Sequence, residues 1–360
     1  MMNKIRVLHF IHSLVSGGAE KQLNILCNGM DKNRFDVAIF CVKNDGHDIQ
    51  DDRVIIYSKF RAKLLRIDFF LSIYSCIKKF KPDVIHVWLP PSVTIPAMLV
   101  GKLAGLPVIL SYRSRMMFLR PLMYIEFIVA VLCTTRIISN RAVDDSVRAF
   151  RWLYRMKRGR VIDNAVLVPQ GFHRTNRHGN DSVRFLFVGR LTASKNLVRL
   201  IRAFSQIRNN EECILDIYGI GEQSAEIKSL IQDLNLTERV FMRGYCHNIY
   251  SEMAVSDALV FPSLFEGMPN VLVEALQIGL PVLASDISAN RSVIGNINAV
   301  IWIDPENVEH MSKKIDEFFE RKDELDEMTN NGIRLASHYT VDAMVNKYQD
   351  SYREIAKWKE

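Results

Sequence analysis

Two carboxylates stand eight residues apart in the segment SLFEGMPNVLVEALQIGLPVLASD, residues 263–286. Glu266 falls in a loop, and Pro269 is expected as the first helical residue, because its missing N–H would be unpaired there anyway. Asn270 and Glu274 lie four residues apart and therefore share one face of this helix. Carboxylate and amide groups around a helix start suit the vicinal hydroxyls of sugars. We therefore expect Glu274 to hold a ribose and Glu266 a transferred sugar.

Two cations share a second loop, which follows the strand-like run 184–189. Arg190 and Lys195 stand in this loop, and Gly189 lets its backbone turn closely. A helix is expected to begin at about residue 197. Two positive charges beside a helix N-terminus favour a diphosphate group. The two loops together predict a site for a nucleotide-diphosphate sugar; incidental charges on a solvated loop and a capping glutamate are the alternative.

The elements that must position these residues alternate between strand and helix along the whole chain. Short apolar runs separated by helix-like stretches predict βαβ units and parallel sheets. Ligands of such sheets bind beyond the carboxyl ends of the strands, which is where both loops lie. About twelve strands are too many for one sheet, so we expect an α/β fold with two doubly wound, Rossmann-like domains. The strand-like runs are 5–11, 36–42, 83–88, 107–112, 136–140, 160–165, 184–189, 214–219, 239–244, 258–263, 281–286 and 299–304.

The alternating pattern stops at residues 166–182, where Gly, Pro, Asn and His collect. This break predicts an N-terminal domain over residues 1–165 and a C-terminal domain over residues 166–340. A last helix is predicted over residues 341–360, with Thr340 as its cap. Its apolar stripe is Met344, Val345, Tyr348, Tyr352 and Ile355.

The net charge of +7 is unevenly spread along the chain. Residues 1–165 hold 26 lysines and arginines against 13 aspartates and glutamates, whereas residues 166–360 are net acidic. Such asymmetry suggests that the first half faces an anionic partner. Nucleic acid and an anionic membrane surface both fit, and ordinary solvated helix faces are the alternative. The basic stretches interleaved with apolar residues are 59–81, 113–120 and 148–160.

Several other kinds of site are disfavoured by the sequence. The six cysteines show no C-x-x-C spacing, so buried, reduced thiols are expected. The N-terminus reads as a strand rather than a signal peptide, and the apolar stretch 121–134 is too short to span a membrane. Gly219 and Gly221 resemble the start of a dinucleotide fingerprint, but Ser224 stands where the third glycine would be. No D-x-D pattern occurs, which argues against a metal-dependent GT-A transferase.

Taken together, these motifs resemble the retaining glycosyltransferase family 4, whose fold is GT-B. The order and spacing of the motifs carry the resemblance, which covers nearly the whole chain and extends to VIDNAV at 161–166, where the family commonly has V-I-P-N-G-V. The motifs are Gly17–Glu20, Gly189–Asn196, Tyr218–Gly221, Phe241–Gly244 and Pro262–Val282.

The resemblance implies a nucleotide-sugar-binding C-terminal domain and an acceptor-binding N-terminal domain, to which the last helix crosses back. It implies that Glu266, Arg190 and Lys195 act in catalysis, the two cations neutralising the leaving diphosphate. The donor base would lie near Tyr245, and glycines near residue 17 would let the first loop approach the diphosphate. The residues expected to contact the donor, some through backbone N–H groups, are Gly17, Gly18, Gly189, Tyr245, Gly267, Met268, Asn270 and Glu274.

The chain departs from the family at the end of the fourth strand, where many relatives have H-x-H. Here the residues are His86-Val87-Trp88, and Trp88 rather than His86 is expected in the inward place, because side chains alternate along a strand. Some members active on bacterial surface polysaccharides also carry Trp there. No histidine base is needed if the leaving diphosphate accepts the acceptor's proton. His12, Trp88 and Arg113 are the residues expected on the acceptor side.

We therefore interpret the sequence as a metal-independent, retaining hexosyltransferase without a cofactor. Its acceptor is expected to be a polyprenyl-diphosphate-linked glycan in the biosynthesis of a surface polysaccharide, such as lipopolysaccharide O-antigen, capsule or exopolysaccharide. The expected location is cytoplasmic, peripheral on the inner face of the cytoplasmic membrane, with no nucleic-acid partner. A GT-B epimerase, a phosphorylase-like enzyme, a catalytically inactive partner subunit and a nucleic-acid-binding protein are the alternatives.

Overall fold

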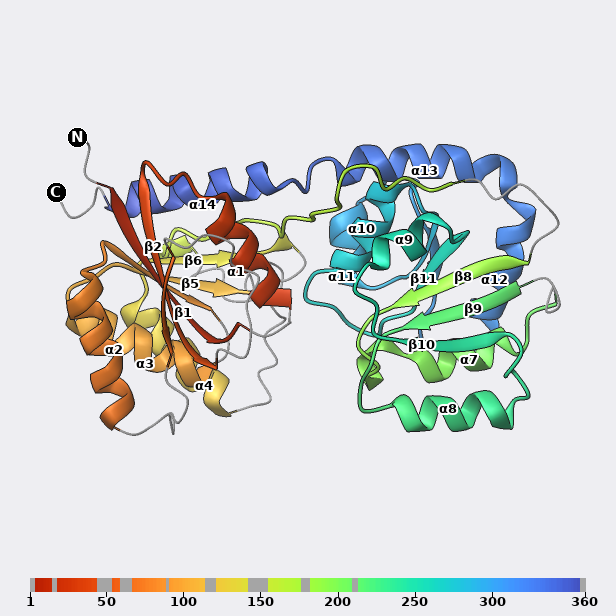
Figure 1. Cartoon of the computed structure of the whole chain (residues 1–360), viewed down its shortest axis with the longest axis horizontal. Coiled ribbons are helices and arrows are strands. Elements are labelled where there is room, and N and C mark those ends of the chain that lie inside the picture. The colour runs from red at the N-terminus through yellow and green to blue at the C-terminus, as the bar shows by residue number, and fades with distance from the viewer. Residues whose placement is uncertain are drawn as a thin grey trace. The chain divides into compact units, whose positions relative to one another are not determined.

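The computed structural model describes residues 4–14, 18–43, 54–58, 67–88, 91–113, 121–141, 155–175, 182–208 and 213–356. The chain forms two compact units (Figure 1). The first unit comprises Met1–Ala165 together with Tyr339–Glu360, and the second comprises Val166–His338. Each unit is a parallel sheet with helices packed on it, so the predicted fold of two doubly wound α/β domains is confirmed.

The first unit is built on a sheet of seven strands within the described residues, in the order β3-β2-β1-β4-β5-β6-β7. Every neighbouring pair is parallel. The strand order reverses between β1 and β4, and side chains after these two strands lie at the switch point where open sheets bind ligands. The strands are β1 (Ile5–Ser13), β2 (Phe35–Lys43), β3 (Ile55–Ser58), β4 (Val84–Trp88), β5 (Val108–Tyr112), β6 (Arg136–Ser139) and β7 (Arg160–Val161).

Helices cover both faces of this first sheet (Figure 1). α2 (Ile67–Phe80), α3 (Pro91–Leu103) and α4 (Pro121–Cys133) bury their apolar stripes against one face. α1 (Gly18–Gly29) and α14 (Val341–Ala356) pack on the other. The hydroxyl of Thr340 accepts the N–H of Ala343 at 3.1 Å, so the predicted cap of α14 is confirmed. All five residues of the predicted α14 stripe are buried.

The second unit is built on a sheet in the order β10-β9-β8-β11-β12-β13, again parallel throughout. Its strands are β8 (Val183–Val188), β9 (Cys213–Tyr218), β10 (Val240–Gly244), β11 (Ala258–Phe261), β12 (Val282–Ser285) and β13 (Ile301–Ile303). Its helices are η1 (Ala193–Lys195), α7 (Leu197–Phe204), α8 (Ser224–Asp233), α9 (Ile249–Ala254), α10 (Asn270–Ile278), α11 (Ser288–Ile294), α12 (Val308–Glu320) and α13 (Lys322–Ala336).

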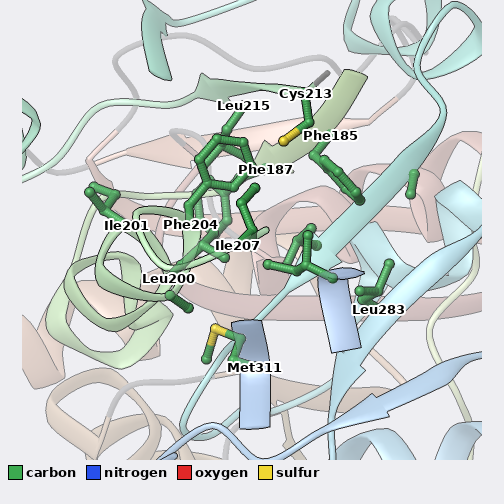
Figure 2. Close-up of a cluster of buried hydrophobic side chains, with 14 of the residues drawn as sticks. Phe185, Phe187, Leu200, Ile201, Phe204, Ile207, Cys213, Leu215, Leu283 and Met311 are labelled. Carbon is green, nitrogen blue, oxygen red and sulfur yellow. The ribbon is translucent and has the colours of Figure 1, made fainter. Parts of the chain in front are cut away.

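Apolar packing joins β8, one of the two central strands of this sheet, to α7 and α12, and Figure 2 shows Phe185, Phe187, Phe204 and Met311 of this cluster. Phe185 and Phe187 are two residues apart on β8, so both point to the same face, and both are buried. The ring of Phe185 meets Phe204 of α7 edge-on at 6.3 Å and Phe318 of α12 at 5.4 Å. This packing fixes the strand whose carboxyl end carries the loop of Arg190 and Lys195.

Two strands differ from the sequence prediction. β3 was not predicted, because a four-residue strand at a sheet edge gives almost no periodic signal. β7 was predicted to run to residue 165 but ends at Val161. Beyond that point the backbone pairs with side chains: the carbonyl of Ile162 accepts from Arg113, and Ala165 N–H donates to Gln22.

Two further observations concern the whole chain. All six cysteines are free, and five are buried while Cys246 is partly exposed, so the expectation of buried thiols holds for five of them. No helix in the described part of the chain is both long enough and apolar enough to cross a bilayer.

Candidate functional site

The loop after β8 rests directly on the loop after β9, backbone against backbone. Gly189 N–H donates to the carbonyl of Tyr218 at 3.0 Å, and Leu191 N–H donates to the carbonyl of Ile220 at 3.1 Å. A Cβ on Gly219 would lie 1.8 Å from the carbonyl oxygen of Gly189, and one on Gly221 would lie 2.3 Å from that of Leu191. Gly219 and Gly221, which resemble part of a dinucleotide fingerprint, therefore allow the backbone of the loop after β9 to contact the loop that carries Arg190 and Lys195.

Asn196 ties this loop to two others at the carboxyl edge of the sheet. Its backbone is left-handed, with φ 61° and ψ 30°, a conformation that few residues other than glycine adopt. Its buried amide Nδ2 donates to the carbonyls of Pro262 at 3.1 Å and Pro305 at 2.6 Å. Leu264 N–H also donates to the carbonyl of Ser194 at 2.9 Å. Sequence reasoning included Asn196 in a motif but missed this role.

Lys195 and Glu266 form an ion pair between the two loops that the sequence singled out. Lys195 Nζ lies 2.5 Å from Glu266 Oε1, and the two side chains are 19% and 11% exposed. The ammonium also lies 5.3 Å from the ring centroid of Phe261 at the end of β11. The sequence predicted that one group binds phosphate and the other sugar, and the structure brings the two into direct contact.

Arg190 differs from Lys195 in its surroundings. The Arg190 side chain is exposed, and among the described residues no hydrogen bond or ion pair engages its guanidinium. The Arg190 guanidinium therefore adds an exposed positive charge to the same loop that carries Lys195. Such a charge suits an anionic ligand.

The helix that carries Glu274 begins one residue later than predicted. α10 starts at Asn270, and Pro269 is the cap residue rather than the first helical residue, because its carbonyl accepts the first helical bond from Val273 at 3.2 Å. Within this segment Met268 is buried, whereas Gly267 and Asn270 are half-buried. Asn270 and Glu274 do occupy successive turns of α10, as expected.

Glu274 is buried inside the second unit, with 4% of its surface exposed. The hydroxyl of Tyr250 on α9 lies 3.5 Å from Glu274 Oε1 and donates to the carbonyl of Leu167 at 3.0 Å. Tyr250 was not predicted from the sequence, which offers no signal that this tyrosine reaches α10. Tyr245, which was predicted near the donor base, is 66% exposed and meets the ring of His247 edge-on at 5.0 Å.

The predicted residues of the first unit lie near the carboxyl ends of β1, β4 and β5. Gly17 lies outside the described residues, and Gly18 begins α1. His12 is half-buried at the end of β1, where burial and the charge of Lys43 lower its pKa. Its Nδ1 has no hydrogen-bond partner among the described residues.

Trp88 points inward as expected, but His86 does so too, and the expected contrast between the two residues is wrong. Residues two apart on a strand point to the same face, and the rings of His86 and Trp88 lie 4.6 Å apart, both fully buried. The Trp88 indole N–H donates to Nδ1 of His9 at 3.1 Å. His86 lies between the hydroxyls of Tyr352 and Ser111, each at 2.7 Å. Burial lowers the pKa of His9 to about 3, so these rings form a neutral core beneath α14.

Arg113 joins this core rather than projecting from the basic stretch in which it was noted. Its Nη1 donates to the carbonyl of Ile162 at 2.8 Å and to Oδ1 of Asn164 at 3.0 Å. Its guanidinium lies 5.3 Å from the ring centroid of Trp88. Burial lowers the pKa of Arg113 to about 10. The remaining basic residues at 59–66, 114–120 and 148–154 lie outside the described residues.

The donor set of the described residues offers no evident metal site. Within the described ranges, no three His, Cys, Asp or Glu side chains come together as ligands for an ion. The charged side chains of the candidate site are the cations Lys195 and Arg190 and the carboxylate of Glu266.

Comparisons with known proteins bear on both halves of the chain. Residues 16–166 match the family model described as Glycosyltransferase Family 4, and residues 171–335 match that of Glycosyl transferases group 1. The UDP-Gal:alpha-D-GlcNAc-diphosphoundecaprenol alpha-1,3-galactosyltransferase of Escherichia coli is 28% identical over 325 residues, which cover 82% of each chain.

A second relative, from Campylobacter jejuni, is an N-acetylgalactosaminyltransferase whose name gives a diphospho-undecaprenol-linked substrate. It is 36% identical over 125 residues, which cover 34% of each chain. Among solved structures, HepE from Anabaena in complex with UDP superposes with a TM-score of 0.82 at 16% identity, over 98% of this chain and 100% of HepE. At that identity the likeness establishes a shared fold.

Proposed function

This chain belongs to the family 4 glycosyltransferases of GT-B fold, and we propose that it transfers a hexose from a nucleotide-diphosphate sugar to a lipid-linked glycan. The observation that carries the proposal is the Lys195–Glu266 ion pair beside the exposed Arg190, at the carboxyl edge of a parallel sheet. HepE and the Escherichia coli enzyme, by their names, use or bind uridine nucleotides, which makes UDP-sugars the first donors to test.

Donor binding would divide the Lys195–Glu266 pair between two parts of one ligand. The diphosphate would draw the Lys195 ammonium and the Arg190 guanidinium, because charge-assisted bonds to phosphate are strong and this edge is only partly solvated. Glu266 Oε1, released from Lys195, would then accept hydrogen bonds from sugar hydroxyls. Glu274, held beside Tyr250, would bind the ribose.

The transfer itself would be driven by stabilising the leaving group. The bond between the anomeric carbon and the diphosphate oxygen breaks, and negative charge grows on that oxygen where Lys195 and Arg190 lie. A hydroxyl of the acceptor forms the new bond to the anomeric carbon on the same face, so the configuration is retained. Its proton passes to the departing diphosphate, which fits the absence of a histidine at the position of Trp88. This chemistry uses neither a metal nor a cofactor.

The acceptor half of the proposal rests on the relatives and on charge. Two relatives are named for diphospho-undecaprenol-linked substrates. The net positive charge of residues 1–165 favours an acceptor that carries diphosphate at an anionic membrane surface. The proposed setting is the assembly of a bacterial surface polysaccharide on the inner face of the cytoplasmic membrane.

A thermal-shift screen over UDP-, GDP- and ADP-sugars tests the donor class, because a ligand that binds only the folded state raises the melting temperature. Transfer assays with the best donor then compare Lys195→Ala with Lys228→Ala, whose lysine is exposed on α8 away from the loops. Lys195→Ala should lower kcat by roughly 100- to 1000-fold. Glu266→Gln should chiefly impair transfer, with the nucleotide itself still bound.

Equal activity of Lys195→Ala and Lys228→Ala would contradict the assigned site. The anomeric configuration of the product, read by NMR coupling constants, tests retention independently. An inverted product would overturn the same-face mechanism and leave the donor site standing.

A further inference from the structure

Three helices of the first unit carry large apolar side chains that no described part of the chain covers. α2, α3 and α4 lie together on one face of the sheet, α3 contacting both of its neighbours (Figure 1). Their exposed apolar side chains are Ile67, Leu71 and Tyr74 on α2, Leu103 at the end of α3, and Ile125, Ile128 and Leu132 on α4. We call the surface formed by these seven residues the α2–α4 face.

The spacing of these residues makes continuous stripes rather than scattered exposures. On α2 they recur at intervals of four and three residues, and on α4 at three and four, so each set lies along one helix face. Leu71 is 60% exposed and Leu132 is 65% exposed. Both helices already bury a second stripe against the sheet. A helix that is apolar on opposite sides, as α4 is, is normally buried on both sides, so its exposed stripe indicates a second apolar partner.

The exposed charged side chains in the described parts of these helices are all lysines. Lys78, Lys79 and Lys102 are exposed, whereas the carboxylates of Asp68 and Glu126 are half-buried and buried. The Lys78 ammonium lies 5.4 Å from the ring centroid of Tyr74, at the edge of the α2 stripe. Apolar side chains rimmed by lysine and tyrosine are the combination found on proteins that lie in the interface of an anionic bilayer.

We propose that the α2–α4 face docks the enzyme on an anionic lipid bilayer, with the apolar stripes entering the headgroup boundary and the lysines contacting lipid phosphates. The lysines favour this occupant over a second copy of the chain, because a self-interface here would bring like charges together. A nucleic acid is a poorer occupant, because its phosphate backbone offers no apolar surface to the seven exposed aliphatic and aromatic side chains. This docking face rests on the proposed function, because a lipid-linked acceptor is the reason for the enzyme to bind a membrane. Membrane binding can nevertheless be measured separately from sugar transfer.

Co-sedimentation of the full chain with vesicles tests the proposal. Wild type should bind vesicles of phosphatidylglycerol and phosphatidylcholine more strongly than vesicles of phosphatidylcholine alone. The double variant Leu71→Glu/Ile128→Glu should bind the anionic vesicles at least about tenfold more weakly, since two apolar contacts become anionic. Lys78→Glu/Lys102→Glu should lose the preference for anionic vesicles.

Val255→Glu/Ile297→Glu is the matched control, because it places the same charges at exposed apolar positions of the second unit and should bind as wild type does. Circular dichroism and the thermal shift by UDP should be unchanged in every variant. A failed UDP shift in wild type would count against the donor proposal and leave the vesicle result intact. Unchanged vesicle binding by Leu71→Glu/Ile128→Glu would overturn the docking face. A change from dimer to monomer in that variant, by light scattering, would assign the face to a second copy instead.

Discussion

The two units hold the polar groups within and just after their strands by different means. In the second unit, backbone lies on backbone at Gly219, and the buried amide of Asn196 joins separate loops. In the first unit, side chains do this work: Tyr352 of α14 hydrogen-bonds His86 at the middle of β4. In the second unit, backbone contacts leave charged side chains partly exposed for a ligand. In the first unit, the polar side chains instead hydrogen-bond one another and fix α14 on the sheet.

The units also differ in how they bury ionisable groups. In the second unit, the buried carboxylate of Asp216 lies 2.6 Å from Nε of Arg243 and 2.9 Å from Nε of Arg184. In the first unit, the buried Glu126 has no ion pair with any described residue and accepts a hydrogen bond from Thr94. Burial raises the pKa of Glu126 to about 7, so the folded first unit keeps this carboxyl protonated at pH values where an exposed glutamate is ionised. Stability of the first unit should therefore respond to pH more than that of the second.

The largest effect is expected when the backbone contact between the loops after β8 and β9 is broken. Gly219 has φ +148°, and an alanine Cβ there would lie 1.8 Å from the carbonyl oxygen of Gly189. Gly219→Ala should lower the unfolding free energy of the second unit by about 4 kcal/mol or more. Gly171→Ala is the control: φ is also positive, at +91°, but nothing lies within 4 Å, so its cost should be about 1 kcal/mol. Native-state hydrogen exchange shows which unit is destabilised. Equal losses of unfolding free energy in the two variants would contradict the close backbone contact between the loops after β8 and β9.

The next effect sharpens the contrast in buried charge. The pKa of Glu126 is raised from 4.5 to about 7, so between these values the unfolded chain ionises this carboxyl while the folded chain keeps its proton. Its contribution to stability is therefore complete below about pH 4.5 and is lost as pH rises to about 7. Glu126→Gln should remove this dependence and raise the unfolding free energy at pH 8 by up to about 3 kcal/mol.

Denaturant unfolding at pH 5 and pH 8 measures this difference for Glu126→Gln. Glu238→Gln, at an exposed position of the second unit, is the control and should leave both values unchanged. His9 acts in the opposite direction, because its pKa is lowered to about 3 and the folded state resists its protonation below about pH 6.5. A wild-type stability that is flat from pH 5 to 8, with Glu126→Gln also flat, would contradict the assignment to Glu126.

The smallest effect breaks the side-chain arrangement of the first unit. Tyr352→Phe removes the hydroxyl at 2.7 Å from Nδ1 of His86 and leaves a buried ring nitrogen unpaired, which should cost about 1–2 kcal/mol. Tyr348→Phe, one turn earlier on α14, is a close control, because that hydroxyl is buried without a partner among the described residues. It should be neutral or slightly stabilising. No loss in Tyr352→Phe would show that ring packing, not the hydrogen bond, holds α14, and similar losses in both variants would show that the cost is not specific to the bond to His86.

Periodicity allowed the elements of the fold to be predicted. The stripe of α14 follows from the helical spacing of its apolar residues, and the strands from residue 183 onward follow from short continuous apolar runs. The edge strands of the first sheet could not be predicted as well. An edge strand such as β3 needs few apolar residues, and β7 ends where side chains from distant segments form the hydrogen bonds to its backbone.

The candidate site could be predicted to the level of loops but not of contacts. Lys195 and Glu266 stand out by type and position after their strands, yet 71 residues separate them, and only the folded chain shows that they pair. His86 was wrongly placed on the face opposite Trp88 by an error of strand geometry, since residues two apart on a strand share a face. Tyr250 gave no signal, since its reach to Glu274 depends on how α9 packs against α10.

The return of α14 to the first unit has a consequence for synthesis on the ribosome. Residues 4–165 leave the exit tunnel first, but their sheet lacks one covering helix until Tyr339–Ala356 emerges, after the whole second unit has been made. During that interval the face with His86 and Trp88 is covered by α1 but not by α14. The second unit, which is continuous in sequence, can fold before the first is finished, and a premature stop near the end of the message would damage the domain encoded at its beginning.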